Sequence, residues 1–186
     1  MKRILDLIAV VFLLVLLSPL MLVVALMIKL TSKGSVLYWS DRVGIDNKIF
    51  RMPKFRTMRV NTPPIATHLF KNPDQSLTLI GSFLRRFSLD ELPQLFSIMS
   101  GNMTFVGPRP ALFNQYDLME LRTEKNIHKL IPGVTGWAQV NGRDNLPIPV
   151  KVEFDEYYLK NKSFPLDFKV LLITLVKAVK GEGVHH

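Results

Sequence analysis

The chain has 186 residues, of which 48% are hydrophobic and 21% are charged, and its formal net charge is +9. This balance excludes an intrinsically disordered protein, which combines low hydrophobicity with high net charge. Cysteine is absent from the sequence, which excludes a disulfide scaffold, a cysteine-based zinc site and thiol catalysis, and favours a reducing compartment.

The apolar residues concentrate near the N-terminus. Within residues 4–30 only four positions fall outside the hydrophobic set: Asp6, Ser18, Pro19 and Lys29. At about 1.5 Å per helical residue, this stretch is long enough to cross a bilayer core of about 30 Å. We therefore predict two parts, a membrane segment over residues 1–30 and a basic globular domain over residues 31–186.

Two features bear on how this segment meets the membrane. Ser18-Pro19 lies near its middle, where proline removes a backbone donor and bends a helix, and a serine hydroxyl can deepen the bend. Basic residues also stand at both ends, namely Lys2, Arg3, Lys29 and Lys33. Because positive charge favours the cytoplasmic side, a re-entrant hairpin broken at Ser18-Pro19 competes with a straight or kinked span.

The remaining sequence predicts mainly helices with a small β component. Short strands are expected at Val36–Trp39 and Lys48–Arg51 around a turn at Gly44–Asn47. Helices are expected at Leu77–Phe87, Asp90–Met99, Ala111–His128 and Leu166–Lys180, and loops at Thr62–Ser76, Gly107–Pro110 and Pro132–Asp144. The last helix carries an apolar stripe beside lysines, which suits either core packing or a position in the membrane interface.

The most distinctive local pattern is residues 84–93, LRRFSLDELP. If Pro93 lies in the first helical turn, Asp90 falls near the N-cap and Glu91 in the first turn. Acidic residues at that place often only cap the helix. However, a carboxylate can also attack a phosphoryl group, and Mg²⁺ is usually held by one or two carboxylates together with substrate phosphates. Capping and phosphoryl chemistry therefore both fit the pair.

Further cations stand in two short motifs. In Gly107-Pro108-Arg109-Pro110 each proline holds the residue before it extended, so the arginine is preset for a phosphate contact or is a surface residue in a stiff turn. In the stretch 54–58, KFRTM, strand alternation would point Lys54 and Arg56 to one face.

The glycine-rich stretch 132–143, PGVTGWAQVNGR, brings amides, an indole and an arginine into one loop, which suits a nucleotide or simple packing of the tryptophan. The sequence contains no P-loop, no GxGxxG and no serine nucleophile elbow. Its aromatic residues lie mostly in apolar runs, so anionic lipid or a phosphorylated substrate explains the positive charge without nucleic acid.

Taken together, these motifs resemble the bacterial sugar transferase family, the monotopic phosphoglycosyl transferases. The resemblance covers nearly the whole chain in fixed order, and the chain is most similar to the small members that begin bacterial N-linked glycan assembly. The matching stretches are the hydrophobic helix with Ser18-Pro19 and residues 54–58, 89–94, 105–110 and 132–143. Residues 61–74 match no motif of the family.

The resemblance implies an enzyme at the cytoplasmic face of the bacterial inner membrane. It would transfer a phosphosugar from a UDP-sugar, expected to be an N-acetylated amino sugar, to polyprenyl (undecaprenyl) phosphate and release UMP, the first membrane step of glycoconjugate assembly. The implied fold is α/β and mainly helical: a re-entrant membrane helix over residues 1–30 and a compact catalytic domain over residues 31–186 with interfacial amphipathic helices. Membrane lipid is then an expected partner, and nucleic acid is not.

The resemblance also implies roles for individual residues. Asp90 would be the nucleophile that carries a covalent phosphosugar, and Glu91 would be associated with Mg²⁺. The expected substrate-binding residues are Arg56, Arg85 and Arg109 around phosphate, Arg143 toward the nucleotide, and Asp155 at a further polar position. Relatives often have lysine where this chain has Arg56, which keeps the charge. A membrane-anchored binding module, a scaffold and a conventional glycosyl transferase that releases UDP are the competing functions.

Overall fold

The structure is a computed structural model that describes residues 2–60, 62, 76–142 and 146–180. Its helices are α1 (Lys2–Thr31), α2 (Gly81–Arg86), α3 (Gln94–Met99), α4 (Tyr116–Glu124), α5 (Trp137–Asn141), α6 (Ile148–Asn161) and α7 (Phe164–Lys180). Its strands are β1 (Leu37–Val43), β2 (Ile49–Phe55), β3 (Thr104–Val106) and β4 (Gly133–Thr135), and the 3₁₀ turns are η1 (Ile45–Asn47), η4 (Leu89–Glu91) and η5 (Ile127–Lys129). The predicted class, mainly helical with a small β component, is confirmed.

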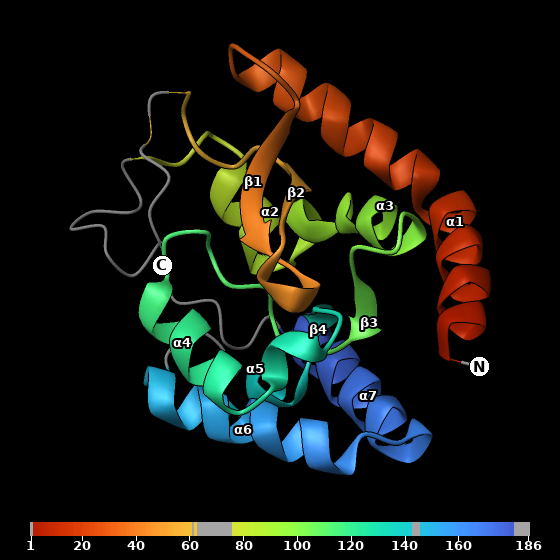
Figure 1. Cartoon of the computed structure of the whole chain (residues 1–186). Coiled ribbons are helices and arrows are strands. Elements are labelled where there is room, and N and C mark those ends of the chain that lie inside the picture. Colours follow the sequence, from red (N-terminus) through yellow and green to blue (C-terminus); the bar gives the residue numbers. More distant parts are fainter. Residues whose placement is uncertain (1, 61, 63–75, 143–145, 181–186) are drawn as a thin grey trace.

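Helix α1 runs without interruption from Lys2 to Thr31 and curves along one side of the molecule (Figure 1). Pro19 lies inside it, and Ser18 Oγ donates a hydrogen bond to the Val15 carbonyl at 2.9 Å, as expected at a bend. The predicted break at Ser18-Pro19 is therefore a bend within one helix. Among the described residues, α1 is the one helix long and apolar enough to cross a membrane.

One face of α1 packs on the rest of the protein along most of its length. In its first half Val10 packs with Ile98 of α3 in one core cluster. In its second half Val24 and Ile28 pack with Leu84 of α2 in another. The opposite face is apolar and exposed, and it includes Ile8, Val11, Phe12, Val15, Leu16, Leu22, Val23 and Leu26. The helix thus belongs to the globular core on one side and offers a hydrocarbon surface on the other.

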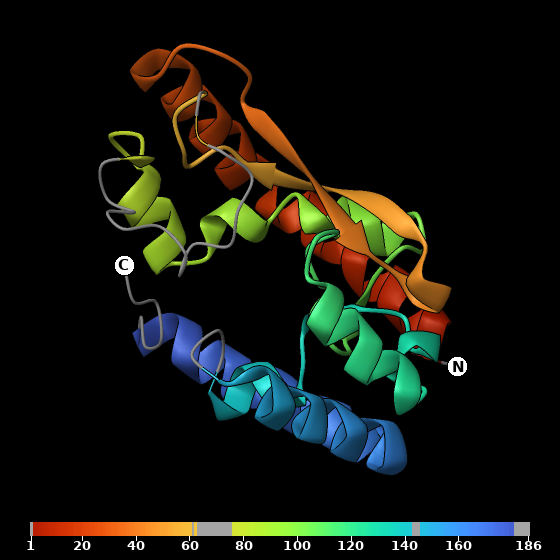
Figure 2. The ribbon, with the colours of Figure 1, turned by 60° about the vertical axis from the view of Figure 1, so that its left-hand side comes forward.

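The two predicted short strands form an antiparallel hairpin and are longer than expected. β1 pairs with β2 in the register Leu37↔Phe55 to Val43↔Ile49. The turn between them is where the sequence predicts it, and Asp46 has a positive φ of 53°, which aspartate tolerates better than most residues. Through β2 the hairpin packs on the short helix α3 and on the turn η4 (Figure 2).

The predicted loop 132–144 is partly wrong, because it contains β4 and α5. β4 pairs in parallel with β3, and three residues between a proline and a glycine are too few to show a strand pattern. The pairing requires glycine: a Cβ built on Gly133 would lie 2.1 Å from the Gly107 nitrogen. Two motifs that are separate in the sequence therefore touch through their glycines.

Two predicted helices are shorter than expected. The region 77–87 is helical only in α2, and the region 111–128 only in α4 and the turn η5. In the second region the Leu112 backbone N–H donates to Gln115 Oε1 at 2.8 Å, a local side-chain bond that competes with the first helical turn.

Helices α6 and α7 lie together on one side of the molecule (Figure 2). Val170 of α7 is fully buried in a cluster with Val106, Val140 and Tyr158, so the core-packing interpretation of this helix holds for one face. Its other face exposes apolar residues, namely Phe164, Phe168, Leu171, Leu172, Leu175 and Val176. That second face is what a helix in the membrane interface needs, so the interfacial position stays a prediction.

Candidate active site

The Asp90–Glu91 pair lies in η4, a tight turn between α2 and α3. The prediction that Asp90 stands near the N-cap of a helix ending at Met99 is wrong. Pro93 has no backbone N–H, and α3 begins only after it, with Pro93 as N-cap. Ser88, just before the turn, has a left-handed φ of 54°, which costs a non-glycine residue about 1 kcal/mol. The two carboxylates are thus presented by a strained turn.

Glu91 is the paired member of the two carboxylates. Its Oε1 accepts hydrogen bonds from Lys54 Nζ and Arg109 Nη2, each at 2.8 Å. Burial alone would raise the pKa of Glu91, but the charges and hydrogen bonds of Arg109 and Lys54 outweigh burial and hold this pKa well below its usual value. Glu91 is therefore ionised throughout the neutral range.

Asp90 is the unpaired member. Asp90 is 8% exposed. Within the described parts of the chain no group donates a hydrogen bond to its carboxylate. Burial raises the pKa of Asp90 to about 6; Lys54 opposes this shift, and the neighbouring Glu91 charge adds to it. The carboxylate oxygens are thus desolvated and their lone pairs are uncommitted, which suits a nucleophile.

Three cations from three separate elements surround the pair: Lys54 from β2, Arg85 from α2 and Arg109 from the loop after β3. Arg85 is oriented by Thr57, whose Oγ1 accepts from Arg85 Nε at 3.0 Å. Burial lowers the pKa of Arg85, while the charges of Asp90 and Glu91 act in the opposite direction. Three positive groups around two carboxylates leave a surplus of positive charge, which favours a ligand that carries phosphate.

The loop that carries Arg109 is extended, as its prolines predict, and β4 holds it on one side. The Gly107 N–H donates to the Thr135 carbonyl, and the Gly133 N–H donates to the Pro108 carbonyl, both at 2.9 Å. This close approach of two backbones fixes the loop on the small parallel sheet.

Asp155 lies behind this loop rather than in contact with Glu91. It is 1% exposed in the middle of α6, and its Oδ2 accepts hydrogen bonds from Arg122 Nε at 3.0 Å and Arg122 Nη2 at 2.6 Å. Burial raises the pKa of Asp155 even though Arg122 opposes the shift. Arg122 in turn donates from Nη1 to the Arg109 carbonyl at 2.8 Å. Asp155 is therefore linked to Arg109 only indirectly in the described structure, by hydrogen bonds through Arg122.

The structure does not bring Arg56 to the other cations. Its Nη1 donates to the Lys33 carbonyl at 2.5 Å, and its Nη2 donates to Ser32 Oγ at 2.7 Å. β2 ends at Phe55, so the alternation expected to point Lys54 and Arg56 to one face does not extend to Arg56. Arg143 lies outside the described residues, as does residue range 61–74 except for Thr62.

Two residues of the site were missed or undervalued by sequence reasoning. The sequence marks Lys54 as a cation but not as the partner of the Asp90–Glu91 turn, because that approach depends on the packing of β2 against η4. Arg122 has no local signal, since it lies in an ordinary polar helix.

Trp137 stacks on Tyr157 with ring centroids 5.5 Å apart, beneath Lys169, which supports the packing interpretation of this tryptophan.

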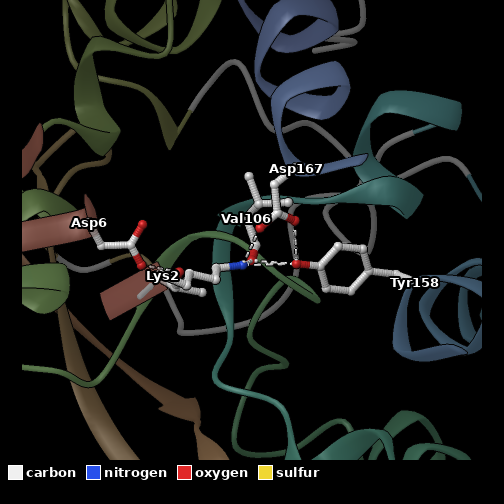
Figure 3. Close-up of polar contacts among 6 residues, drawn as sticks. Lys2, Asp6, Val106, Tyr158 and Asp167 are labelled. Atoms are coloured by element: carbon white, nitrogen blue, oxygen red, sulfur yellow. Dashed lines mark hydrogen bonds and ion pairs between the residues drawn. The ribbon is translucent and has the colours of Figure 1, made fainter. Parts of the chain in front are cut away.

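The N-terminal end of α1 contacts the strand that leads to Arg109 (Figure 3). Lys2 Nζ donates to the Val106 carbonyl at 2.8 Å, to Tyr158 Oη at 2.9 Å and to Asp167 Oδ2 at 2.7 Å. One helical turn further on, Asp6 accepts a hydrogen bond from a threonine of β3. The polar residues at this end of the apolar helix are thus bound to the globular domain.

Comparison with known proteins identifies the class to which this fold and site belong. Residues 1–181 match the family described as bacterial sugar transferase. The chain is 39% identical over 187 residues to the uncharacterized sugar transferase EpsL of Bacillus subtilis, covering 99% of this chain and 90% of that protein. The chain belongs to the bacterial sugar transferase family.

Other relatives carry names that state a reaction. The chain is 37% identical over 188 residues to the UDP-N-acetylgalactosamine-undecaprenyl-phosphate N-acetylgalactosaminephosphotransferase of Aeromonas hydrophila. It is 38% identical over 193 residues to the UDP-glucose:undecaprenyl-phosphate glucose-1-phosphate transferase of Escherichia coli. These matches cover 98% and 100% of this chain but only 44% and 41% of the relatives, so the chain spans less than half of either relative.

Proposed function

We propose that this protein transfers a phosphosugar from a UDP-sugar to polyprenyl (undecaprenyl) phosphate and releases UMP. The observation that carries the proposal is the pair of carboxylates in η4. Among the described residues none donates a hydrogen bond to Asp90, two cations hold Glu91, and a third cation lies beside them. The names of the Aeromonas and Escherichia relatives, each a transferase of a sugar phosphate to undecaprenyl phosphate, support the same reaction.

The reaction has two displacement steps at one phosphorus atom. In the first, an Asp90 carboxylate oxygen attacks the β-phosphorus of the UDP-sugar, and the bond from that phosphorus to the bridging oxygen breaks. The bridging oxygen and its electron pair leave with UMP, and an aspartyl phosphosugar remains. In the second, a phosphate oxygen of the polyprenyl phosphate attacks the same phosphorus and displaces the Asp90 carboxylate, forming a polyprenyl diphosphate sugar.

The surrounding residues counter the repulsion between a carboxylate nucleophile and an anionic substrate. Arg109 and Lys54 hold Glu91 ionised, and together with Arg85 they supply positive charge where the diphosphate must lie. Burial of Asp90 removes the water shell that would otherwise compete for its oxygens. The turn therefore provides both the attacking group and the charge that stabilises the transition state.

Glu91 also fits the proposed Mg²⁺. No group of three or more metal-binding side chains occurs among the residues that the structure describes, but Mg²⁺ commonly takes only one or two carboxylates and fills its shell with water and substrate phosphates. Glu91, kept ionised and next to Asp90, would hold the ion. When bound, Mg²⁺ would neutralise charge on the diphosphate and on the departing UMP.

We also propose that α1 enters and leaves the cytoplasmic leaflet of the inner membrane without crossing it. Lys2 at one end is bound to Asp167 of α7 and Tyr158 of α6, and Thr31 at the other end leads directly into β1. Both ends of α1 are therefore attached to the same globular domain. A helix that crosses the bilayer would separate them, so the bend at Pro19 supports a re-entrant path.

The donor is proposed to be a UDP-linked N-acetylated amino sugar. The Aeromonas relative is named for N-acetylgalactosamine, which supports this choice, whereas the Escherichia relative is named for glucose. Direct comparison of the donors is therefore part of the test.

The test is nucleotide release by purified protein in detergent with Mg²⁺ and a panel of UDP-sugars, without acceptor lipid and beside Asp90→Asn. A burst of UMP equal to the amount of enzyme, absent from the variant, is expected for the covalent intermediate. Adding polyprenyl phosphate should then give continuous turnover. Release of UDP would show a conventional glycosyl transferase, and no release with acceptor present would contradict the proposal.

Labelling of single cysteines tests the membrane path. The sequence has no native cysteine, so cysteines placed at Lys33 and at Lys29 report on one side without background, and one placed at Arg3 reports on the other end. All three should react from the cytoplasmic face. Labelling of the Arg3 position from the opposite face would show a transmembrane helix.

A further inference from the structure

We propose that Arg122 is a positioning residue for Arg109, and that Asp155 acts by holding Arg122 in place. The inference rests on the proposed function, because it concerns how Arg109 is kept at the phosphate-binding cluster. It gives the buried acid of α6 a defined task at a distance from the substrate.

Both the side chain and the carbonyl of Arg109 are held by other residues. Its side chain donates to Glu91 at 2.8 Å, and its carbonyl accepts from Arg122 at 2.8 Å. The carbonyl contact fixes the peptide plane from which the side chain departs. Because the residue stands between two prolines that supply no backbone N–H, the loop has few backbone donors of its own. Backbone bonds with β4 hold its first part at Gly107 and Pro108, and side chains from other elements hold the carbonyls of Arg109 and Pro110.

Arg122 is suited to hold a carbonyl rigidly. It is 8% exposed, and its Nε, Nη1 and Nη2 all donate, two of them to Asp155 and one to Arg109. Since a guanidinium is planar, fixing two donors on one carboxylate sets the direction of the third. Asp155 itself is on α6, one helical turn from the fully packed Val152. The position of the Arg109 carbonyl is therefore fixed relative to the buried residues of α6.

The next carbonyl of the loop is held from the other side. Arg42 of β1 donates from Nη1 to the Pro110 carbonyl at 3.1 Å. Two arginines from different elements thus donate to the carbonyl of Arg109, which contacts Glu91, and to the carbonyl of the next residue. Desolvating two guanidinium groups at one short loop is costly, which indicates that they position this loop rather than fill space.

The energetics point the same way. A buried ion pair is a weak source of stability, because desolvation offsets most of the attraction, and apolar replacement of both partners is often neutral. In the Arg122–Asp155 pair burial dominates strongly enough to raise the pKa of Asp155. A pair that contributes little to stability, yet directs its remaining donor at the Arg109 carbonyl, is explained by the placement of Arg109.

The test replaces the pair without leaving a lone charge. In the double variant Arg122→Met/Asp155→Leu the fold should persist, and kcat should fall about 10- to 100-fold, the range typical when a group that orients an active-site residue is removed. Arg122→Lys, which keeps one donor, should recover part of kcat. The matched control is Val152→Ala, which weakens the same region of α6 without touching Arg122 and should keep the wild-type kcat.

A second arm asks whether the effect passes through Arg109. Combined with Arg109→Ala, the double variant should cause no further loss, because the positioned side chain is already gone. If the double variant lowers the kcat of Arg109→Ala by a further factor of about 10 to 100, as it is expected to lower that of the wild type, the inference is overturned. A folded double variant with wild-type kcat would overturn it as well.

A third arm does not depend on activity. Hydrogen exchange at the backbone amides of Gly107, Gly133 and Val43, which donate to the carbonyls of Thr135, Pro108 and Ala111, should accelerate in the double variant and not in Val152→Ala. If the wild-type protein transfers no phosphosugar, the proposed function fails, and exchange still decides the inference. Unchanged exchange at these amides would show that Arg122 does not hold the loop.

Discussion

Asp90 and Asp155 are both buried aspartates, and burial raises the pKa of each, but their surroundings differ. Asp155 lies in the middle of a regular helix and receives two hydrogen bonds from one arginine. Asp90 lies in a strained 3₁₀ turn, where charges stand nearby but none donates to it in the described structure. The same side chain accepts two hydrogen bonds in one place and, among the described residues, none in the other.

Under the proposed function, hydrogen bonding divides the tasks of the two buried acids. A carboxylate whose lone pairs are used is a fixed point for its neighbours, whereas a carboxylate whose lone pairs are open keeps its capacity to form a bond. The neighbour of Asp90 supports this division, because Glu91 takes the direct contacts of Lys54 and Arg109 and so leaves Asp90 free of them.

The largest expected effect is on turnover by Asp90→Asn. An amide cannot form the acyl phosphate, so phosphosugar transfer should fall by about 10³-fold or more. UMP release with radiolabelled donor measures the loss. Asp41→Asn, which changes an exposed aspartate of β1, is the matched control and should stay active. Activity of Asp90→Asn near the wild-type rate would assign the nucleophile elsewhere.

The next largest expected effect is the loss of stability when Asp155, which is hydrogen-bonded to Arg122, is replaced. Asp155→Leu leaves Arg122 charged and unpaired in the core, so the free energy of unfolding should fall by about 3–5 kcal/mol. Denaturant unfolding in detergent, followed by tryptophan fluorescence, gives this value. The double variant Arg122→Met/Asp155→Leu should recover most of it. A small loss of stability in Asp155→Leu alone would mean that water reaches Arg122.

The proposed nucleophile should have the opposite effect on stability. With its pKa raised to about 6, Asp90 binds a proton more readily in the folded state than in the unfolded state, so its effect on stability becomes unfavourable as pH rises from about 4 to 6 and stays so above. A shift of about two units corresponds to about 3 kcal/mol. Metal-free Asp90→Asn should therefore be more stable than wild type at pH 7.5 by up to that amount.

The measurement is unfolding in EDTA at pH 7.5 and at pH 4, where the difference between Asp90→Asn and wild type should shrink. Equal stability at both values would show that Asp90 is well solvated in the folded protein.

The smallest expected effect concerns the arginine beside Asp90. Arg85 is oriented by a threonine hydroxyl, in contrast to the carboxylate that orients Arg122. Thr57→Val removes this acceptor and keeps the side-chain shape, which should cost about 1 kcal/mol of stability and lower turnover several-fold. Thr57→Ser should restore both. Parallel unfolding and rate measurements on the two variants decide whether the hydroxyl orients Arg85.

Patterns in single elements were predictable from the sequence. The hairpin of β1 and β2 follows from its turn residues, α7 from its apolar spacing, and the Asp90–Glu91 pair from its arginines and proline. What escaped prediction depends on pairing between distant segments. β4 is too short to show a period and exists because Gly133 lets it approach Gly107, and the approach of Lys54 to Glu91 depends on where the hairpin packs.

Residue type alone also could not separate an arginine that lies away from the cluster, Arg56, from one that is linked to it, Arg122. Arg56 and Arg122 are both buried arginines, and neither has a local pattern that names its partner. Only the ends of the elements decide: β2 stops one residue before Arg56, and the last turn of α4 aims Arg122 at α6.

The bond between Lys2 and Asp167 has a consequence for biogenesis. It joins α1 to α7, and roughly 130 residues separate the end of one helix from the start of the other. At about 5–20 residues per second of synthesis, α1 has to wait on the order of 10 s for that partner. During this interval its apolar surface lacks the contacts that hold its N-terminal end to the domain. Translation thus makes this helix before α7, and the contacts proposed to keep both ends of α1 on one side of the membrane form only after α7 has been made.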